Sequence, residues 1–130
     1  MKNQSLAARI VLALFAAALV AGCASAPPDP GKIADGVLVN PAGMTLYTFD
    51  RDPPGSGKSM CNGPCVGLWP PLMAAANATP PNAAWQVITR DDGNKQWAYQ
   101  GKPLYLWSKD AKPGDRTGDG FNNVWKVARP

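Results

Sequence analysis

Histidine and glutamate are both missing from this chain of 130 residues, so all nine of its acidic residues are aspartates. Histidine is the side chain that most often serves as a general base, and no serine or cysteine here stands in a nucleophile motif. A c-type haem signature is also absent, and the thiolates of Cys61 and Cys65 alone cannot complete a tetrahedral zinc shell. We therefore expect a protein that is not an enzyme and that holds no metal and no cofactor.

Clusters of positive charge are absent as well. The thirteen Lys and Arg residues give a net charge of +4, but Lys2 and Arg9 belong to an N-terminal segment that has the features of a signal. The chain beyond residue 22 keeps eleven basic residues against nine aspartates, a net charge of +2. Nucleic-acid-binding domains normally carry a concentrated basic patch, so nucleic acid is not an expected partner.

The first 22 residues have the pattern of a secretory signal. Lys2 and Arg9 precede an uncharged apolar run over 10–21, which is shorter than the roughly 20 residues that a membrane-spanning helix needs. The run ends in Val-Ala-Gly before Cys23, which resembles the site where bacterial lipoproteins are cleaved and lipidated. We expect residues 1–22 to be removed and Cys23 to carry a lipid anchor. The alternative is a soluble secreted protein in which Cys23 is incidental.

Residues 23–35 are rich in proline and small residues, which is typical of an extended tether between a lipid and a folded domain. Ala24, which follows the cysteine, is compatible with sorting to an outer membrane in a cell that has two membranes. The expected location is the cell envelope outside the cytoplasm, with the domain facing the periplasm.

Residues 36–130 predict one small all-β domain of antiparallel strands. Runs of β-branched and aromatic residues alternate with turn residues, and no amphipathic helix pattern is present. The expected strands cover 36–40, 44–49, 85–90, 95–99, 103–107 and 123–127. The first two are predicted to form a hairpin and the next three a meander. Alternation along the second strand places Tyr47 and Phe49 on one face and Leu46 on the other. Residues 73–84 are predicted to be a surface crossover.

Two copies of one pattern, Tyr-x-aromatic-x-x-Asp, divide this domain into repeats of about 36–72 and 85–127. The motif residues are Tyr47, Phe49 and Asp52 in the first copy and Tyr105, Trp107 and Asp110 in the second. Each copy is followed by a tryptophan, Trp69 or Trp125. Because a single hairpin is marginal in water, we expect the two repeats to share one core.

This paired motif, together with the cysteine pair and the segments Trp69-Pro-Pro-Leu72 and Gln96-Trp-Ala-Tyr99, resembles a family of predicted bacterial lipoproteins and secreted repeat proteins named for the motif. The resemblance covers nearly all of the chain from Gly36 to Val127. It implies an extracytoplasmic location and a two-repeat architecture, and it implies no particular chemistry.

Cys61 and Cys65 are the cysteines of the expected domain, and an even number in an oxidising compartment predicts a disulfide. Two roles are open for this pair. A structural staple would support a small domain, whereas a redox-active dithiol would use the close spacing for thiol exchange. Only Lys58 lies near enough in the sequence to activate a thiolate, so we favour the structural role.

Aspartates are concentrated in the expected loops, and their roles are also open. They are Asp50, Asp52, Asp110, Asp115 and Asp119. Carboxylate oxygens are calcium ligands, so a weak calcium site is one hypothesis. The spacing of Asp115 and Asp119 is not that of an EF-hand loop, and loop aspartates commonly accept hydrogen bonds from backbone N–H groups. We favour turn capping.

Aromatic residues on one face of a sheet usually form a core, and we expect Trp69 and Trp125 to be buried structural anchors. An exposed subset of aromatic side chains would instead form a groove for a small ligand or an envelope protein. The sequence therefore favours a non-catalytic binding or structural role. A redox accessory based on Cys61 and Cys65, or a weak aspartate-based calcium site, is the alternative.

Overall fold

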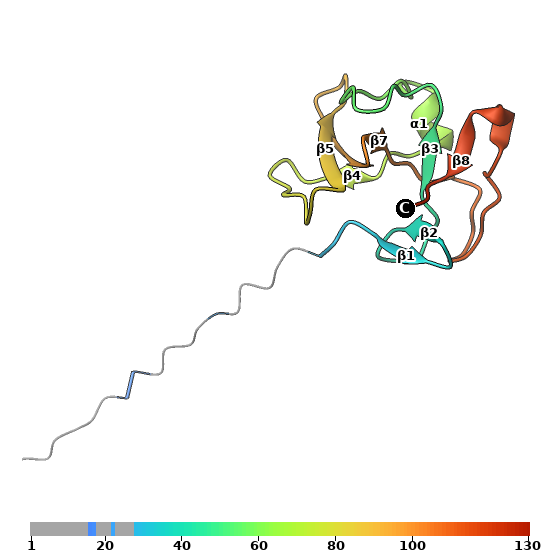
Figure 1. The fold of residues 1–130 in the computed structure, drawn as a ribbon. Coiled ribbons are helices and arrows are strands. Elements are labelled where there is room, and N and C mark those ends of the chain that lie inside the picture. Colours follow the sequence, from blue (N-terminus) through green and yellow to red (C-terminus); the bar gives the residue numbers. More distant parts are fainter. Residues whose placement is uncertain (1–15, 18–21, 23–27) are drawn as a thin grey trace, which may run out of the picture.

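The computed structural model describes residues 16–17, 22 and 28–130. Residues 28–130 form an all-β domain (Figure 1), which confirms the predicted fold class. The expected lipidation site at Cys23 and nearly all of the signal segment 1–22 lie outside the described residues. No helix among the residues that the structure describes is long and apolar enough to span a bilayer.

Short strands, one helical turn and one 3-10 turn make up the described domain. In chain order they are β1 (Lys32–Ala34), β2 (Val37–Val39), β3 (Tyr47–Phe49), α1 (Cys65–Leu68), β4 (Met73–Ala74), β5 (Trp85–Thr89), β6 (Lys95–Tyr99), β7 (Lys102–Pro103), the 3-10 turn η1 (Phe121–Asn123) and β8 (Trp125–Val127). All strand pairs are antiparallel: β1 with β2, β3 with β8, and β6 with β4, β5 and β7. The predicted meander is thus confirmed as β5–β6–β7, but its third strand covers only Lys102–Pro103 in place of the expected 103–107.

The predicted hairpin between 36–40 and 44–49 is present but short, and the rest of the second strand has another partner. β3 pairs with β8 at the far end of the chain, with Tyr47 opposite Val127, and the two strands lie side by side in Figure 1. The hairpin itself consists of an antiparallel bridge between Val39 and Thr45. Backbone hydrogen bonds from Leu46 N–H to the Leu38 carbonyl and from Asn40 N–H to the Met44 carbonyl flank this bridge. The rings on β3 find their apolar partners in the second repeat, and this packing decides the pairing over sequence proximity.

Two strands lie where the sequence predicted none. β1 falls within the expected tether 23–35, where Pro30 is already buried, so the folded domain begins before residue 36. Its turn to β2 is made by Asp35 and Gly36, both with positive φ (49° and 77°), as in the two-residue hairpin turns that Asp-Gly favours. β4 lies in the predicted crossover 73–84 and pairs with β6. Strands this short leave no periodic pattern to detect.

The two repeats meet at the motif tyrosines in an approximately two-fold arrangement. The N–H of Tyr47 donates to the carbonyl oxygen of Tyr105 at 2.8 Å, and the reverse bond is 2.9 Å long. The N–H groups of Leu46 and Leu104, one residue earlier in each repeat, bond in turn to β2 and β6. The two predicted repeats are therefore present, and their backbones are bonded directly to each other.

Side chains from the two faces of these strands form two apolar clusters. The first contains Val37, Val39, Tyr47, Cys61, Trp69, Tyr105, Trp107, Trp125 and Val127, and the second contains Leu38, Leu46, Trp85, Trp97, Leu104 and Ala128. Successive side chains of a strand point to opposite faces, and Leu46 and Tyr47 accordingly enter different clusters, as predicted. Both motif tyrosines belong to the first cluster, so the candidate site is built around it.

Candidate functional site

The two copies of the motif cross over, because each tyrosine bonds to the aspartate of the other copy. The hydroxyl of Tyr47 donates to Oδ2 of Asp110 at 2.6 Å, and the hydroxyl of Tyr105 donates to Oδ2 of Asp52 at 2.5 Å. Both tyrosines and Asp52 are buried, and Asp110 is half-buried. The repeats are thus linked reciprocally by side chains as well as by backbone.

The second carboxylate oxygen of each motif aspartate closes its own loop. Oδ1 of Asp52 accepts the backbone N–H of Met60 at 2.7 Å. Oδ1 of Asp110 accepts both the backbone N–H and the hydroxyl of Thr117, at 3.0 and 2.6 Å. All four oxygens therefore have internal donors, in the manner of the turn caps that the sequence favoured over calcium ligands.

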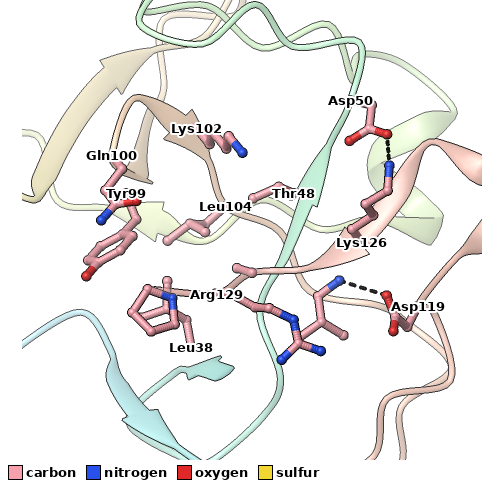
Figure 2. A pocket seen from close by; sticks show the side chains of 13 residues that line it. Leu38, Thr48, Asp50, Tyr99, Gln100, Lys102, Leu104, Asp119, Lys126 and Arg129 are labelled. Carbon is pink, nitrogen blue, oxygen red and sulfur yellow. Dashed lines mark hydrogen bonds and ion pairs between the residues drawn. The ribbon is translucent and has the colours of Figure 1, made fainter. Parts of the chain in front are cut away.

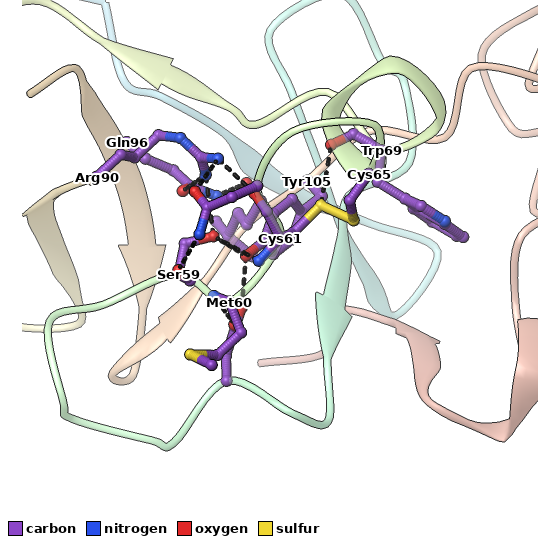
Figure 3. Close-up of a disulfide and its surroundings, with 11 residues drawn as sticks. Ser59, Met60, Cys61, Cys65, Trp69, Arg90, Gln96 and Tyr105 are labelled. Atoms are coloured by element: carbon purple, nitrogen blue, oxygen red, sulfur yellow. Dashed lines mark hydrogen bonds between the residues drawn. A yellow bond between two sulfur atoms is a disulfide. The ribbon is translucent and has the colours of Figure 1, made fainter. Parts of the chain in front are cut away.

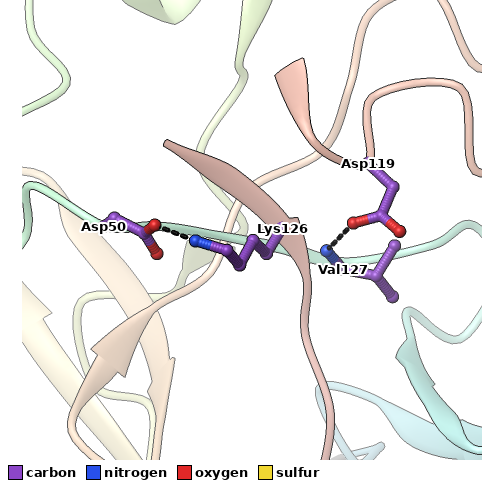
Figure 4. Close-up of polar contacts among 4 residues, drawn as sticks. All are labelled: Asp50, Asp119, Lys126 and Val127. Carbon is purple, nitrogen blue, oxygen red and sulfur yellow. Dashed lines mark hydrogen bonds and ion pairs between the residues drawn. The ribbon is translucent and has the colours of Figure 1, made fainter. Parts of the chain in front are cut away.

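The other loop aspartates make separate contacts. Asp115 accepts two backbone N–H groups of its own turn, and Asp119 accepts the N–H of Val127 at 3.1 Å. Asp50 forms an exposed ion pair with Lys126 on β8 (Figure 4), a type of contact that adds little stability. Within residues 28–130, no three metal-ligating side chains come close enough together to hold an ion.

A buried arginine extends the network, and the sequence pattern gave no sign of it. Arg90 follows β5 and is 5% exposed. Its guanidinium donates to Oγ of Ser59 at 2.9 Å, to Oε1 of Gln96 at 2.7 Å and to the carbonyl oxygen of Cys61 at 2.5 Å. The same Oγ lies 2.6 Å from the hydroxyl of Tyr105. An arginine that precedes a turn is usually exposed, so only the fold reveals these partners.

Burial controls the titration of these groups. It raises the pKa of both tyrosine hydroxyls, and the bonded carboxylate, Asp110 for Tyr47 and Asp52 for Tyr105, raises each pKa further. Burial also raises the pKa of Asp52, although the bonds from Tyr105 and a backbone N–H, and the charge of Arg90, oppose that rise. Both phenols therefore stay protonated and act as donors.

The raised pKa of Asp52 predicts a pH-dependent stability. The folded state holds this proton more tightly than the unfolded state, so its stabilising effect is complete below about pH 3.9 and is lost as the pH rises through the higher folded pKa. We expect the free energy of unfolding of the wild type, relative to Asp52→Asn, to fall across that window in urea titrations. Asp92→Asn is the control. The backbone N–H of Asn94 lowers the pKa of the exposed Asp92, so the stability of the wild type relative to this variant should fall as the pH falls. Parallel curves for the wild type and Asp52→Asn would contradict the assignment.

The cysteines of the first repeat are joined in a disulfide that closes the loop before α1 (Figure 3). Their Cα atoms are 5.3 Å apart. Cys61 is fully buried in the first cluster, whereas Cys65 is half-buried at the start of α1. The bridge therefore stiffens the loop that supplies Ser59 and the Cys61 carbonyl to Arg90.

Replacing both cysteines by alanine is expected to lower the free energy of unfolding by about 2 kcal/mol, because the closed loop is short. The reduced wild type should show the same loss, and the variant should be insensitive to reductant. Urea unfolding with and without dithiothreitol measures both. Rapid thiol exchange with glutathione at unchanged stability would instead favour the redox role.

Five rings form a column in which the first four come alternately from the two repeats and the fifth belongs to the second repeat, like the fourth. Its order is Phe49, Trp125, Trp69, Trp107 and Phe121, with successive ring centroids 4.2, 3.9, 4.2 and 4.9 Å apart. Trp69 and Trp125 lie at the centre, nearly parallel and only 2% and 3% exposed. Gly118 permits this packing, since a Cβ there would lie 2.6 Å from the Trp69 ring. The column belongs to the core and offers no aromatic groove.

An open cleft of about 420 Å³ lies on the other side of β3 and β8 (Figure 2). Leu38 and Leu104 contribute apolar side chains to its lining, and Lys102, Lys126 and Arg129 bring positive charge. Two of the loop aspartates considered as calcium ligands, Asp50 and Asp119, also line it, whereas none of the tyrosines, aromatic residues and aspartates that define the two motifs does. The motif residues thus build the interior and do not face this cleft.

A family model described as "secreted repeat of unknown function" matches the chain twice, at residues 32–73 and 86–129. The chain belongs to this family. The matches reproduce the two structural repeats, and the first begins at β1, in agreement with the early start of the folded domain. Secreted repeats act outside the cytoplasm, which supports the expected extracellular or envelope location. No curated protein and no solved structure matches this secreted repeat protein.

Proposed function

We propose that this secreted repeat protein is an envelope lipoprotein, anchored through Cys23, whose domain acts by binding or as a structural element and not by catalysis. The proposal rests on the hydrogen bonds that the carboxylates of the two motif aspartates already accept. Both oxygens of Asp52 and of Asp110 accept internal hydrogen bonds, and both hydroxyls that bond to them are buried. The carboxylates of the motif therefore serve the fold, because their oxygens already accept hydrogen bonds from within the domain.

The lipid anchor is supported by the sequence around Cys23 and by membership of a secreted family. In a cell with two membranes, Ala24 directs the lipoprotein to the outer membrane, where the domain faces the periplasm. The protein expressed in such a cell should incorporate radiolabelled palmitate and fractionate with the envelope, and Cys23→Ser should lose both properties. Unchanged labelling of Cys23→Ser would reject the anchor.

The open cleft between β3, β7 and β8 is the proposed contact site for a small ligand or an envelope protein. A photo-crosslinking residue in place of Lys102 at the cleft should capture a specific neighbour in intact cells. The same residue in place of Lys109, which is exposed and does not line the cleft, should not. Equal capture at the two positions would argue against a binding role for the cleft.

A further inference from the structure

The ring column and the tyrosine–aspartate pairs touch each other in the core. Trp69 and Trp125 stack at 3.9 Å between centroids. The ring of Tyr47 meets Trp69 edge-on at 5.2 Å, and the ring of Tyr105 meets Trp125 edge-on at 5.0 Å. Tryptophan and tyrosine are the aromatic side chains that lose an electron most readily, and rings in van der Waals contact exchange electrons efficiently. Each tyrosine is therefore in contact with one tryptophan, and the two tryptophans are in contact with each other, so the four rings form a continuous path for an electron.

A phenol gives up an electron easily only when its proton can leave at the same time. The hydroxyls of Tyr47 and Tyr105 are buried away from water, but each already donates to a carboxylate oxygen, at 2.6 and 2.5 Å. Tyr99 provides the contrast inside the same domain. It packs edge-on against Trp85 at 5.0 Å, and the structure shows no carboxylate bonded to its hydroxyl among residues 28–130.

We propose that the ring column and its two tyrosine–aspartate pairs take up one oxidising equivalent from a one-electron oxidant and hold it as a buried tyrosyl radical. Trp107, at 8% exposure, is the entry point. Its indole loses one electron to the oxidant. Trp69 then donates an electron to Trp107, and Trp125 donates one to Trp69. This inference goes beyond the proposed binding role and does not depend on it.

The last step leaves the tyrosine oxidised and the tryptophans restored. Tyr105 or Tyr47 supplies the electron, its O–H bond breaks, and the proton forms an O–H bond on the Asp52 or Asp110 carboxylate. The oxidant gains one electron, the protein loses one electron, and no atom leaves the protein. The proton remains inside the domain, where it can return when the radical is reduced.

The test uses the folded full-length protein, photogenerated ruthenium(III) tris(bipyridine) as the oxidant, and EPR spectroscopy of samples frozen after the flash. Ring-deuterated tyrosine narrows a tyrosyl signal and leaves a tryptophan signal unchanged, so the radical is assigned without any substitution. The chain has three tyrosines, Tyr47, Tyr99 and Tyr105. Tyr99→Phe therefore removes the one that lies outside the site.

We expect a tyrosyl signal in the wild type that keeps its full intensity in Tyr99→Phe. In the double variant Asp52→Asn, Asp110→Asn, once circular dichroism has shown it to be folded, the tyrosyl signal should fall and a tryptophan signal should replace it. A tyrosyl signal that disappears in Tyr99→Phe would overturn the proposal. So would a wild-type radical that resides on tryptophan alone.

Discussion

Replacing Trp69 by alanine is expected to lower the free energy of unfolding by about 3–5 kcal/mol, the usual cost of removing a fully buried tryptophan. Trp69 is 2% exposed and stacks between Trp125 and Trp107. Its loss leaves a cavity in the middle of the column, at the contact between the two repeats. Urea unfolding followed by circular dichroism measures the change.

The matched control is Phe121→Ala, at the end of the same column. Phe121 is 37% exposed and contacts Trp107 and Trp69 from the surface side, so its removal leaves an opening to solvent and no closed cavity. We expect a clearly smaller loss of stability. Equal effects of the two substitutions would show that the column is not the main element of the core.

Replacing Arg90 by methionine is expected to cost about 3–5 kcal/mol, as for other buried charges whose partners are left behind. Methionine fills similar space but donates no hydrogen bond. The carbonyl oxygen of Cys61 and Oε1 of Gln96 would lose a donor, and Asp52 would lose the positive charge of Arg90, which lowers its pKa. Each unsatisfied buried acceptor is costly.

Arg51→Met serves as the control, because Arg51 is exposed beside the motif and changes the same net charge. Its effect should stay within about 0.5 kcal/mol, as for most surface substitutions. A second measurement tests the charge of Arg90 separately from its packing. Because this charge lowers the pKa of Asp52, Arg90→Met should raise that pKa in carboxyl NMR titrations. If Arg90→Met and Arg51→Met are equally stable, the buried network does not support the fold.

Patterns among neighbouring residues were sufficient to predict much of this fold. Alternation along 44–49 separated Leu46 from Tyr47, and the turn residues between β5 and β6 marked the meander, because these features depend on neighbours in the chain. The duplicated spacing likewise revealed two repeats, since both copies keep the same residues at the same separations. Asp35-Gly36 is a turn sequence, but the strands on either side have only three residues each, which is too short for their pattern to predict a hairpin.

Contacts between the repeats could not be predicted in the same way. The spacing places Asp52 and Asp110 at equivalent positions, yet it cannot tell whether each bonds to the tyrosine of its own copy or of the other. Arg90 illustrates the same limit, because its acceptors come from a loop about 30 residues earlier. Both depend on how two halves of the chain dock, which no window of neighbouring residues records.

The alternating order of the ring column has an evolutionary consequence. A polypeptide with only one copy of the motif would have a tyrosine without its aspartate and a tryptophan without its stacking neighbour. Its stable form would be a homodimer that makes these contacts between two copies, whereas the duplicated chain makes them within itself. Joining the two copies in one chain also allows them to differ, and here one half carries a disulfide and the other a fifth ring.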